Sequence, residues 1–222
     1  MNSHLSHTSK QKCFDMISGE VTLEAFEEWV YTSSLEDELS EEDHLDLISF
    51  NFKKNGAKYE LIQLLKRFVD LGEYETQKIR GKLEAALNKD ERLPDLLAEF
   101  YDLRCRGYVF LEDLGMGFGL SIEAPPKHYD QTWEELSREE QDNIIAGFYP
   151  ELDECLKDAI YWLDSGKIVL TGEKELDNDY FLEYHDYRTE AEKKSRLFKE
   201  VRKKWWQFWK PKLKQSGVFW PD

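Results

Sequence analysis

The chain has 222 residues, of which 41% are hydrophobic and 14% aromatic, and its formal net charge is −16. A chain of this length buries about 70–75% of the surface that its unfolded state exposes, so it can form a hydrophobic core without disulfides. The aromatic content excludes a disordered chain, and no apolar run reaches the ~18 residues that a membrane span requires.

The charge is distributed unevenly along the chain. Between residues 188 and 214, eleven Lys and Arg stand against three Glu, a net charge of +8 that leaves −24 on the remainder. A body this anionic repels nucleic acid and anionic lipid within a Debye length of about 8 Å. We therefore expect a cationic protein partner, and neither nucleic-acid nor membrane binding.

Three cysteines, Cys13, Cys105 and Cys155, are too widely spaced for a C-x-x-C site. An odd number with this spacing is typical of reduced thiols on helix faces. The first twelve residues lack the apolar segment of a signal peptide. Together these features predict a cytoplasmic protein.

The first hundred residues have helical periodicity. Thr22 is the expected N-cap of a helix whose apolar side chains face one way, and Ser40, with an acidic residue three positions on, begins another. A third helix is expected over 57–71, with Gly72 as the residue that ends it, and a fourth over 73–87. Pro94, tolerated in a first helical turn, opens a fifth.

The sequence pattern changes after residue 107. Segments 108–114 and 118–124 alternate like strands around a glycine-rich turn, and segments 167–172 and 179–187 resemble further strands. Helices are expected after Ser137, after Pro150 and from Thr189. We therefore predict an α+β fold, predominantly helical, with a small antiparallel sheet of about four strands in the C-terminal half.

This pattern divides the chain into two regions. A helical N-terminal region is expected over 1–106 and an α+β region over 107–222, either as two units or as one continuous domain.

Motifs for catalysis are weak. The run from Gly115 to Gly119 lacks the spacing of a dinucleotide-binding or P-loop motif, so its glycines are expected to supply positive φ in a turn. His4 and His7 are expected in a frayed terminus. His185 and Asp186 would point to opposite faces of a strand. Cys105 has arginine neighbours but no recognisable base. We expect no catalytic residue, no cofactor and no metal ion.

An alternative interpretation is that the protein is an enzyme. Asp186, Arg188 and Glu192 lie where the last expected strand meets the last expected helix. In a cleft they could serve a small hydrolase-like enzyme, and that interpretation requires a deep pocket with perturbed carboxylates. A structural polar cluster is the competing interpretation.

A dense acidic stretch is the stronger candidate site. Seven carboxylates fall within residues 36–46, close to two aromatic residues. Such a run is commonly a solvated face, yet charge accelerates encounter with a cationic protein while aromatic side chains anchor it. The predicted partner-binding residues are Trp29, Tyr31, Glu36, Asp37, Glu38, Glu41, Glu42 and Asp43.

The end of the chain has the opposite sign. On a helical projection, six apolar residues fall within an arc of about 120° and four cations lie outside it. The apolar residues are Leu197, Phe198, Val201, Trp205, Phe208 and Trp209, and the cations are Lys199, Arg202, Lys203 and Lys210. Such a helix could pack on the anionic body, lie on a membrane or bind nucleic acid. The attached negative charge argues against the last two.

The stretch FDMISGEVTLEAFEEWVY, followed by LEDELSEEDHLDLISFNF and a leucine-rich helix, resembles the small bacterial immunity proteins of polymorphic or contact-dependent toxin systems. The resemblance covers about residues 13–70. It implies neutralisation of a cognate toxin by direct binding, with no catalytic residues. The acidic charge would suit a toxin with a cationic, nuclease-type surface; the oligomeric state stays open.

Overall fold

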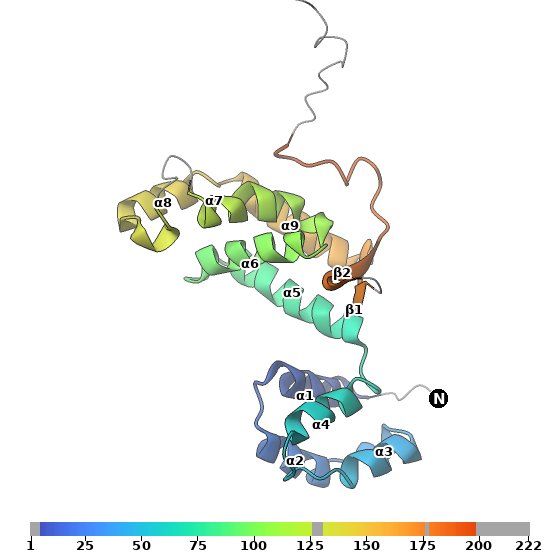
Figure 1. Ribbon diagram of the computed structural model, residues 1–222. Helices are drawn as coiled ribbons and strands as arrows, with labels where there is room; N and C mark the ends of the chain where they lie inside the picture. Colours follow the sequence, from blue (N-terminus) through green and yellow to red (C-terminus); the bar gives the residue numbers. More distant parts are fainter. Residues whose placement is uncertain (1–4, 126–130, 176–177, 199–222) are drawn as a thin grey trace, which may run out of the picture.

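The computed structural model describes residues 5–125, 131–175 and 178–198. These residues form two lobes joined by the link between α4 and α5 (Figure 1). We call residues 5–70 the N-terminal lobe and residues 71–198 the C-terminal lobe. The fold is predominantly helical with a small antiparallel sheet in the C-terminal half, which confirms the predicted class.

The N-terminal lobe is entirely helical within these residues. Its elements are α1 (His7–Ser18), α2 (Leu23–Thr32), the 3-10 turn η1 (Leu35–Asp37), α3 (Glu41–Ile48) and α4 (Ala57–Leu65). Two of the predicted starts are confirmed, because the Thr22 hydroxyl accepts from the Ala25 N–H and the Ser40 hydroxyl from the Asp43 N–H. Fully buried Phe26, Leu61 and Leu65 belong to the core of this lobe.

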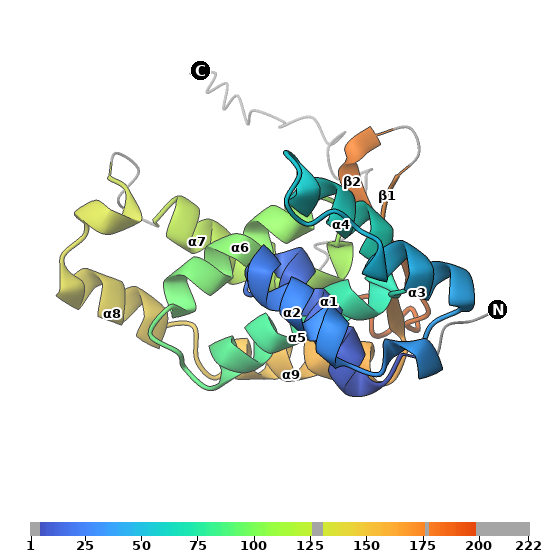
Figure 2. The ribbon, with the colours of Figure 1, turned by 90° about the horizontal axis from the view of Figure 1, so that it is seen from below.

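The C-terminal lobe has its own core. Its elements are α5 (Leu71–Leu87), α6 (Leu93–Cys105), η2 (Val109–Leu111), the π-helix η3 (Asp113–Gly119), α7 (Leu120–Glu123), η4 (Trp133–Glu135), α8 (Arg138–Ala146), α9 (Glu151–Asp164), β1 (Ile168–Glu175) and β2 (Asn178–Asp186). Helices α5, α6 and α9 pack around Leu83, Leu97 and Leu156. Both views place α8 and the β-hairpin at opposite ends of this lobe (Figure 2).

The division between the cores falls near residue 70, whereas the sequence pattern placed a boundary at 106. Helices α5 and α6 were grouped with the N-terminal helices, yet Ile79, Leu83 and Phe100 are buried in the C-terminal core. Figure 2, seen from the side of the N-terminal lobe, has α1 and α2 toward the viewer and α5 behind them.

The strands expected over 108–114 and 118–124 are wrong, because these residues form η2, η3 and α7. The reason is helix packing. A Cβ on Gly115 would lie 2.9 Å from the Phe100 carbonyl oxygen, and one on Gly119 would overlap the Leu97 carbonyl. Neither glycine has positive φ, so they permit close contact with α6 rather than forming a turn.

The sheet within the described residues has two strands, not four. β1 and β2 are antiparallel and pair Ile168 with Asp186 and Leu170 with Tyr184. The strands expected at 167–172 and 179–187 are thereby confirmed.

Three further predictions were wrong. Gly72 does not end a helix: α4 stops at Leu65, and Gly72 is buried in the first turn of α5, where the Asp70 carboxylate caps it and Leu170 packs closely. His7 lies in α1 rather than in a frayed end. Residues 189–198 are not helical, and the remainder of the expected last helix, with His4, lies outside the described residues.

Within the described ranges, no helix combines the length and the apolar character that crossing a bilayer would demand.

Candidate partner-binding surface

Buried leucines orient the acidic stretch. Leu35 begins the 3-10 turn and Leu39 follows it, and they are 1% and 8% exposed; Leu47 is 1% exposed on the inner face of α3. Several of the charged residues between these leucines therefore face solvent. Glu36, Asp37, Glu41 and Glu42 are all exposed. None of these four carboxylates has an ion pair or hydrogen bond from a side chain of the described residues.

The other predicted carboxylates have structural roles. Glu38 accepts a hydrogen bond from the Ser6 N–H at 2.8 Å, at the N-terminus of α1. Asp43 accepts from Arg67 at 2.9 Å, and the neighbouring Asp46 accepts from the same guanidinium at 2.7 Å. These bonds fasten η1 to α1 and α3 to the segment after α4. Glu38 and Asp43 are thus only partly available to a partner.

The two predicted aromatic anchors differ in accessibility. Trp29 is half-buried and packs against Phe26, with ring centroids 5.1 Å apart. Tyr31 is 58% exposed, and its hydroxyl donates to the Ile48 carbonyl at 3.2 Å, which holds the ring beside the end of α3. Tyr31 therefore remains a candidate anchor, and Trp29 contributes mainly to packing.

Leu45 is an apolar residue of this surface that was not among the predicted partner-binding residues. It is 53% exposed on α3. The signal was present, because Leu45 and Leu47 are about 200° apart around a helix and cannot both face inward. We define the acidic surface as the adjoining tyrosine and the exposed residues of η1 and α3 other than Asp46, which is paired with Arg67; its members are Tyr31, Glu36, Asp37, Glu41, Glu42 and Leu45.

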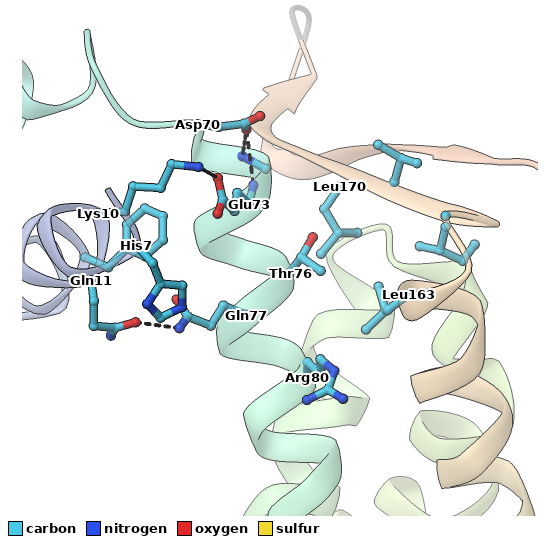
Figure 3. A pocket seen from close by; sticks show the side chains of 15 residues that line it. His7, Lys10, Gln11, Asp70, Glu73, Thr76, Gln77, Arg80, Leu163 and Leu170 are labelled. Atoms are coloured by element: carbon cyan, nitrogen blue, oxygen red, sulfur yellow. Dashed lines mark hydrogen bonds and ion pairs between the residues drawn. The ribbon is translucent and has the colours of Figure 1, made fainter. Parts of the chain in front are cut away.

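A separate cavity of about 440 Å³ lies between the lobes (Figure 3). Helix α1 contributes Lys10 and Gln11, which face Glu73 and Gln77 of α5. Lys10 pairs with Glu73 at 2.7 Å, and the Gln77 amide donates to Gln11 at 2.6 Å. Arg80, also in the lining, is held by Asp164 at 2.7 Å. These polar side chains are thus paired, and the rest of the lining includes apolar Phe14, Leu163 and Leu170.

The alternative site at Asp186, Arg188 and Glu192 consists of two ion pairs. Arg188 is 8% exposed; it donates to both oxygens of Asp186 and its guanidinium carbon lies 4.4 Å from the Trp162 ring centroid. Glu192 pairs instead with Lys167. Glu192 also lines a cavity of about 310 Å³.

The pKa values of these carboxylates are lowered. The hydrogen bond from Lys167, followed by those from Thr189, brings the pKa of Glu192 to about 2. Partial burial raises the pKa of Asp186, but the hydrogen bonds from Arg188 outweigh it and leave that pKa below its usual range. Both groups are therefore anionic at neutral pH and bound to cations, which is unfavourable for a general acid or base.

The remaining candidates do not converge. Cys13, Cys105 and Cys155 are free thiols on α1, α6 and α9, as predicted, and burial raises the pKa of Cys13 and of Cys155 to about 12. His185 is exposed on β2. Among the described residues, no three His, Cys, Asp or Glu side chains gather as metal ligands would.

The acidic surface thus combines unpaired charge with exposed apolar side chains. Comparison of the chain with models of protein families, with curated proteins and with solved structures finds no match in any of the three.

Proposed function

We propose that this protein binds and neutralises a cationic protein partner through the acidic surface, as an immunity or antitoxin-like protein does with its cognate toxin. The observation that carries the proposal is the exposure of Glu36, Asp37, Glu41 and Glu42 beside exposed Tyr31 and Leu45. A partner with a cationic, phosphate-binding surface, such as a nuclease-type toxin, has the complementary charge.

The charged and the apolar side chains of the acidic surface affect different rate constants of binding. Unpaired carboxylates on a chain of net charge −16 attract a cationic partner at long range and raise the association rate. Tyr31 and Leu45 become buried when the complex forms, and this burial lowers the dissociation rate. Fully desolvated side chains carry most of the binding energy at an interface. The hydroxyl bond of Tyr31 to Ile48 fixes the ring in advance, which reduces the entropy lost on binding.

The test is co-expression with the product of the adjacent open reading frame, read as growth rescue and as co-purification. The variant E41K/E42K reverses two charges of the acidic surface and is expected to slow association about tenfold or more at low salt. Y31A is expected to accelerate dissociation. The wild-type complex should itself weaken as salt rises.

A matched control reverses two charges elsewhere. Glu134 and Glu139 are exposed in η4 and on α8, in the other lobe, and neither makes a side-chain ion pair within the described residues. The variant E134K/E139K therefore has the same net charge as E41K/E42K. Equal loss of binding in both variants would show that binding depends only on the net charge of the protein. The absence of any complex or growth rescue would refute the proposal.

A further inference from the structure

The segment after β2 crosses the C-terminal lobe without forming a helix or strand. We call residues 189–198 the strap. Its first part is held by Glu192, which pairs with Lys167 next to β1 and accepts from the Thr189 N–H at 2.9 Å. Most of its residues are exposed. The strap is therefore attached at particular points rather than buried along its length.

The far end of the strap, residues 195–198, is bound to η3 and α9. One oxygen of Asp113 accepts from the Ser195 hydroxyl and the other from the Arg196 N–H at 2.9 Å. The Arg196 Nε donates to Asp158 at 2.6 Å. The Ser195 oxygen in turn accepts from the Phe198 N–H at 2.7 Å, which orders the turn that follows.

Gly117 leaves space for the far end of the strap. A Cβ at this position would overlap Cδ1 of Leu197, whereas Gly115 and Gly119 face α6. Leu197 packs against the C-terminal core through the space that this glycine leaves. The middle glycine of the run thus accommodates the strap, which the sequence pattern did not indicate.

A cavity of about 310 Å³ lies beneath the strap. Phe110, Leu114 and Trp162 of the body line it, together with Cys155, and the strap contributes residues on its other side. Contacts that are mainly ionic and that span a cavity hold a segment weakly, since they bury little apolar surface. The strap is accordingly expected to open at a lower free energy than the helices beneath it.

We propose that the strap, which directly precedes the basic tail (residues 199–222) in the sequence, is a releasable latch fastened to η3 and α9. The tail has seven Lys and Arg against two acidic residues, a net charge of +5, and four tryptophans. Closing the latch holds Ser195, Arg196 and Leu197 on the body and covers the cavity. Opening it exposes the cavity with Cys155. This proposal is independent of the acidic surface and its partner.

Cys155 provides the readout. It is 5% exposed in the closed state, and burial raises its pKa, so it reacts slowly with a thiol reagent. Cys13, 2% exposed in the other lobe, reports unfolding of that lobe in the same sample. Labelling the full chain with dithiobis(nitrobenzoate) or iodoacetamide at pH 8, with peptide mass spectrometry, gives both rates.

The latch predicts that D113A and L197A each accelerate labelling of Cys155 about tenfold or more, with Cys13 unchanged. Raising the salt concentration should accelerate it in the wild-type protein, because the Arg196–Asp158 and Lys167–Glu192 pairs are screened. The variant G117V should open the latch, and L197A added to it should produce little further change, since both act on one contact.

G81A is the matched control for the glycine substitution. Gly81 lies in α5 with no heavy atom within 4 Å of an added Cβ, so the labelling rate of Cys155 should stay at the wild-type value. The proposal is overturned if D113A and L197A leave the rate for Cys155 unchanged. It is equally overturned if Cys13 accelerates by the same factor, because labelling would then report unfolding.

Discussion

Individual carboxylates of one short stretch have different roles, according to what faces them. Glu36 and Glu38 are two residues apart, yet Glu36 is exposed, whereas Glu38 accepts a backbone hydrogen bond from Ser6. Asp43 and Asp46 are fixed by Arg67. Binding and stability are therefore separable by substitution at neighbouring positions.

Replacing Glu38 by Gln tests this separation through pH. Burial raises the pKa of Glu38, but hydrogen bonds from Ser6 and Ser9 outweigh it and leave the pKa below its ordinary value of 4.5. A lowered folded pKa stabilises the fold above the unfolded pKa, and this stabilisation is lost as the pH falls through the folded value. E38Q should therefore be less stable than wild type at pH 7, by less than about 1 kcal/mol because the group is solvent-screened.

The difference should shrink as the pH falls below 4.5, and urea midpoints at pH 7 and pH 3.5 measure it. E36Q is the control and should match wild type within about 0.5 kcal/mol at both values. A constant offset of E38Q across this range would contradict an ionic role for Glu38.

The sequence indicated the acidic stretch but not its internal partners. Ser6 lies 32 positions before Glu38, and Arg67 lies 24 after Asp43. Pairing over such separations depends on how helices pack, which single-sequence patterns do not contain. Leu45 was different, because its outward position follows from helical spacing alone.

At the level of secondary structure elements, the N-cap signals at Thr22, Ser40 and Ser137 were reliable, whereas the glycine and tertiary signals were not. The Ser137 and Glu140 capping box starts α8, as its spacing predicts. The region from 108 to 124 was misread because glycines and apolar residues there resemble a hairpin, whereas they fit the surface of α6. The π-helix η3 follows from contacts that only the folded chain provides.

Substituting Gly119 by Ala tests that contact. The added Cβ would overlap the Leu97 carbonyl and lie 2.9 Å from the Tyr101 Cβ, and neither neighbour can move without shifting α6. We expect a loss of about 1–3 kcal/mol in the free energy of unfolding. G81A, with open space around its Cβ, should instead be neutral or gain up to about 1 kcal/mol from helix propensity. Equal midpoints for both variants in urea would mean that Gly119 is not a packing glycine.

At the scale of the whole molecule, the two cores are connected by a small set of polar and aromatic contacts between α1 and α5. Lys10 with Glu73 and Gln11 with Gln77 bridge α1 and α5, and Phe14 meets Tyr74 with ring centroids 5.2 Å apart. Small polar interfaces permit relative motion of the units that they join. The acidic surface belongs to one lobe and the strap to the other, so they are expected to respond independently.

Native-state hydrogen exchange in two core variants tests this independence. Leu61 and Leu97 are both fully buried, one in each core, and replacing either by Ala should cost about 2–5 kcal/mol locally. L61A should lower amide protection over residues 7–65 and leave residues 93–163 unchanged, and L97A should do the reverse. The first turn of α5 is excluded from the comparison because Leu71 and Tyr74 pack on the N-terminal core. If either variant lowers protection equally in both ranges, the lobes unfold as one cooperative unit, and a partner bound to the acidic surface would then stabilise the strap as well.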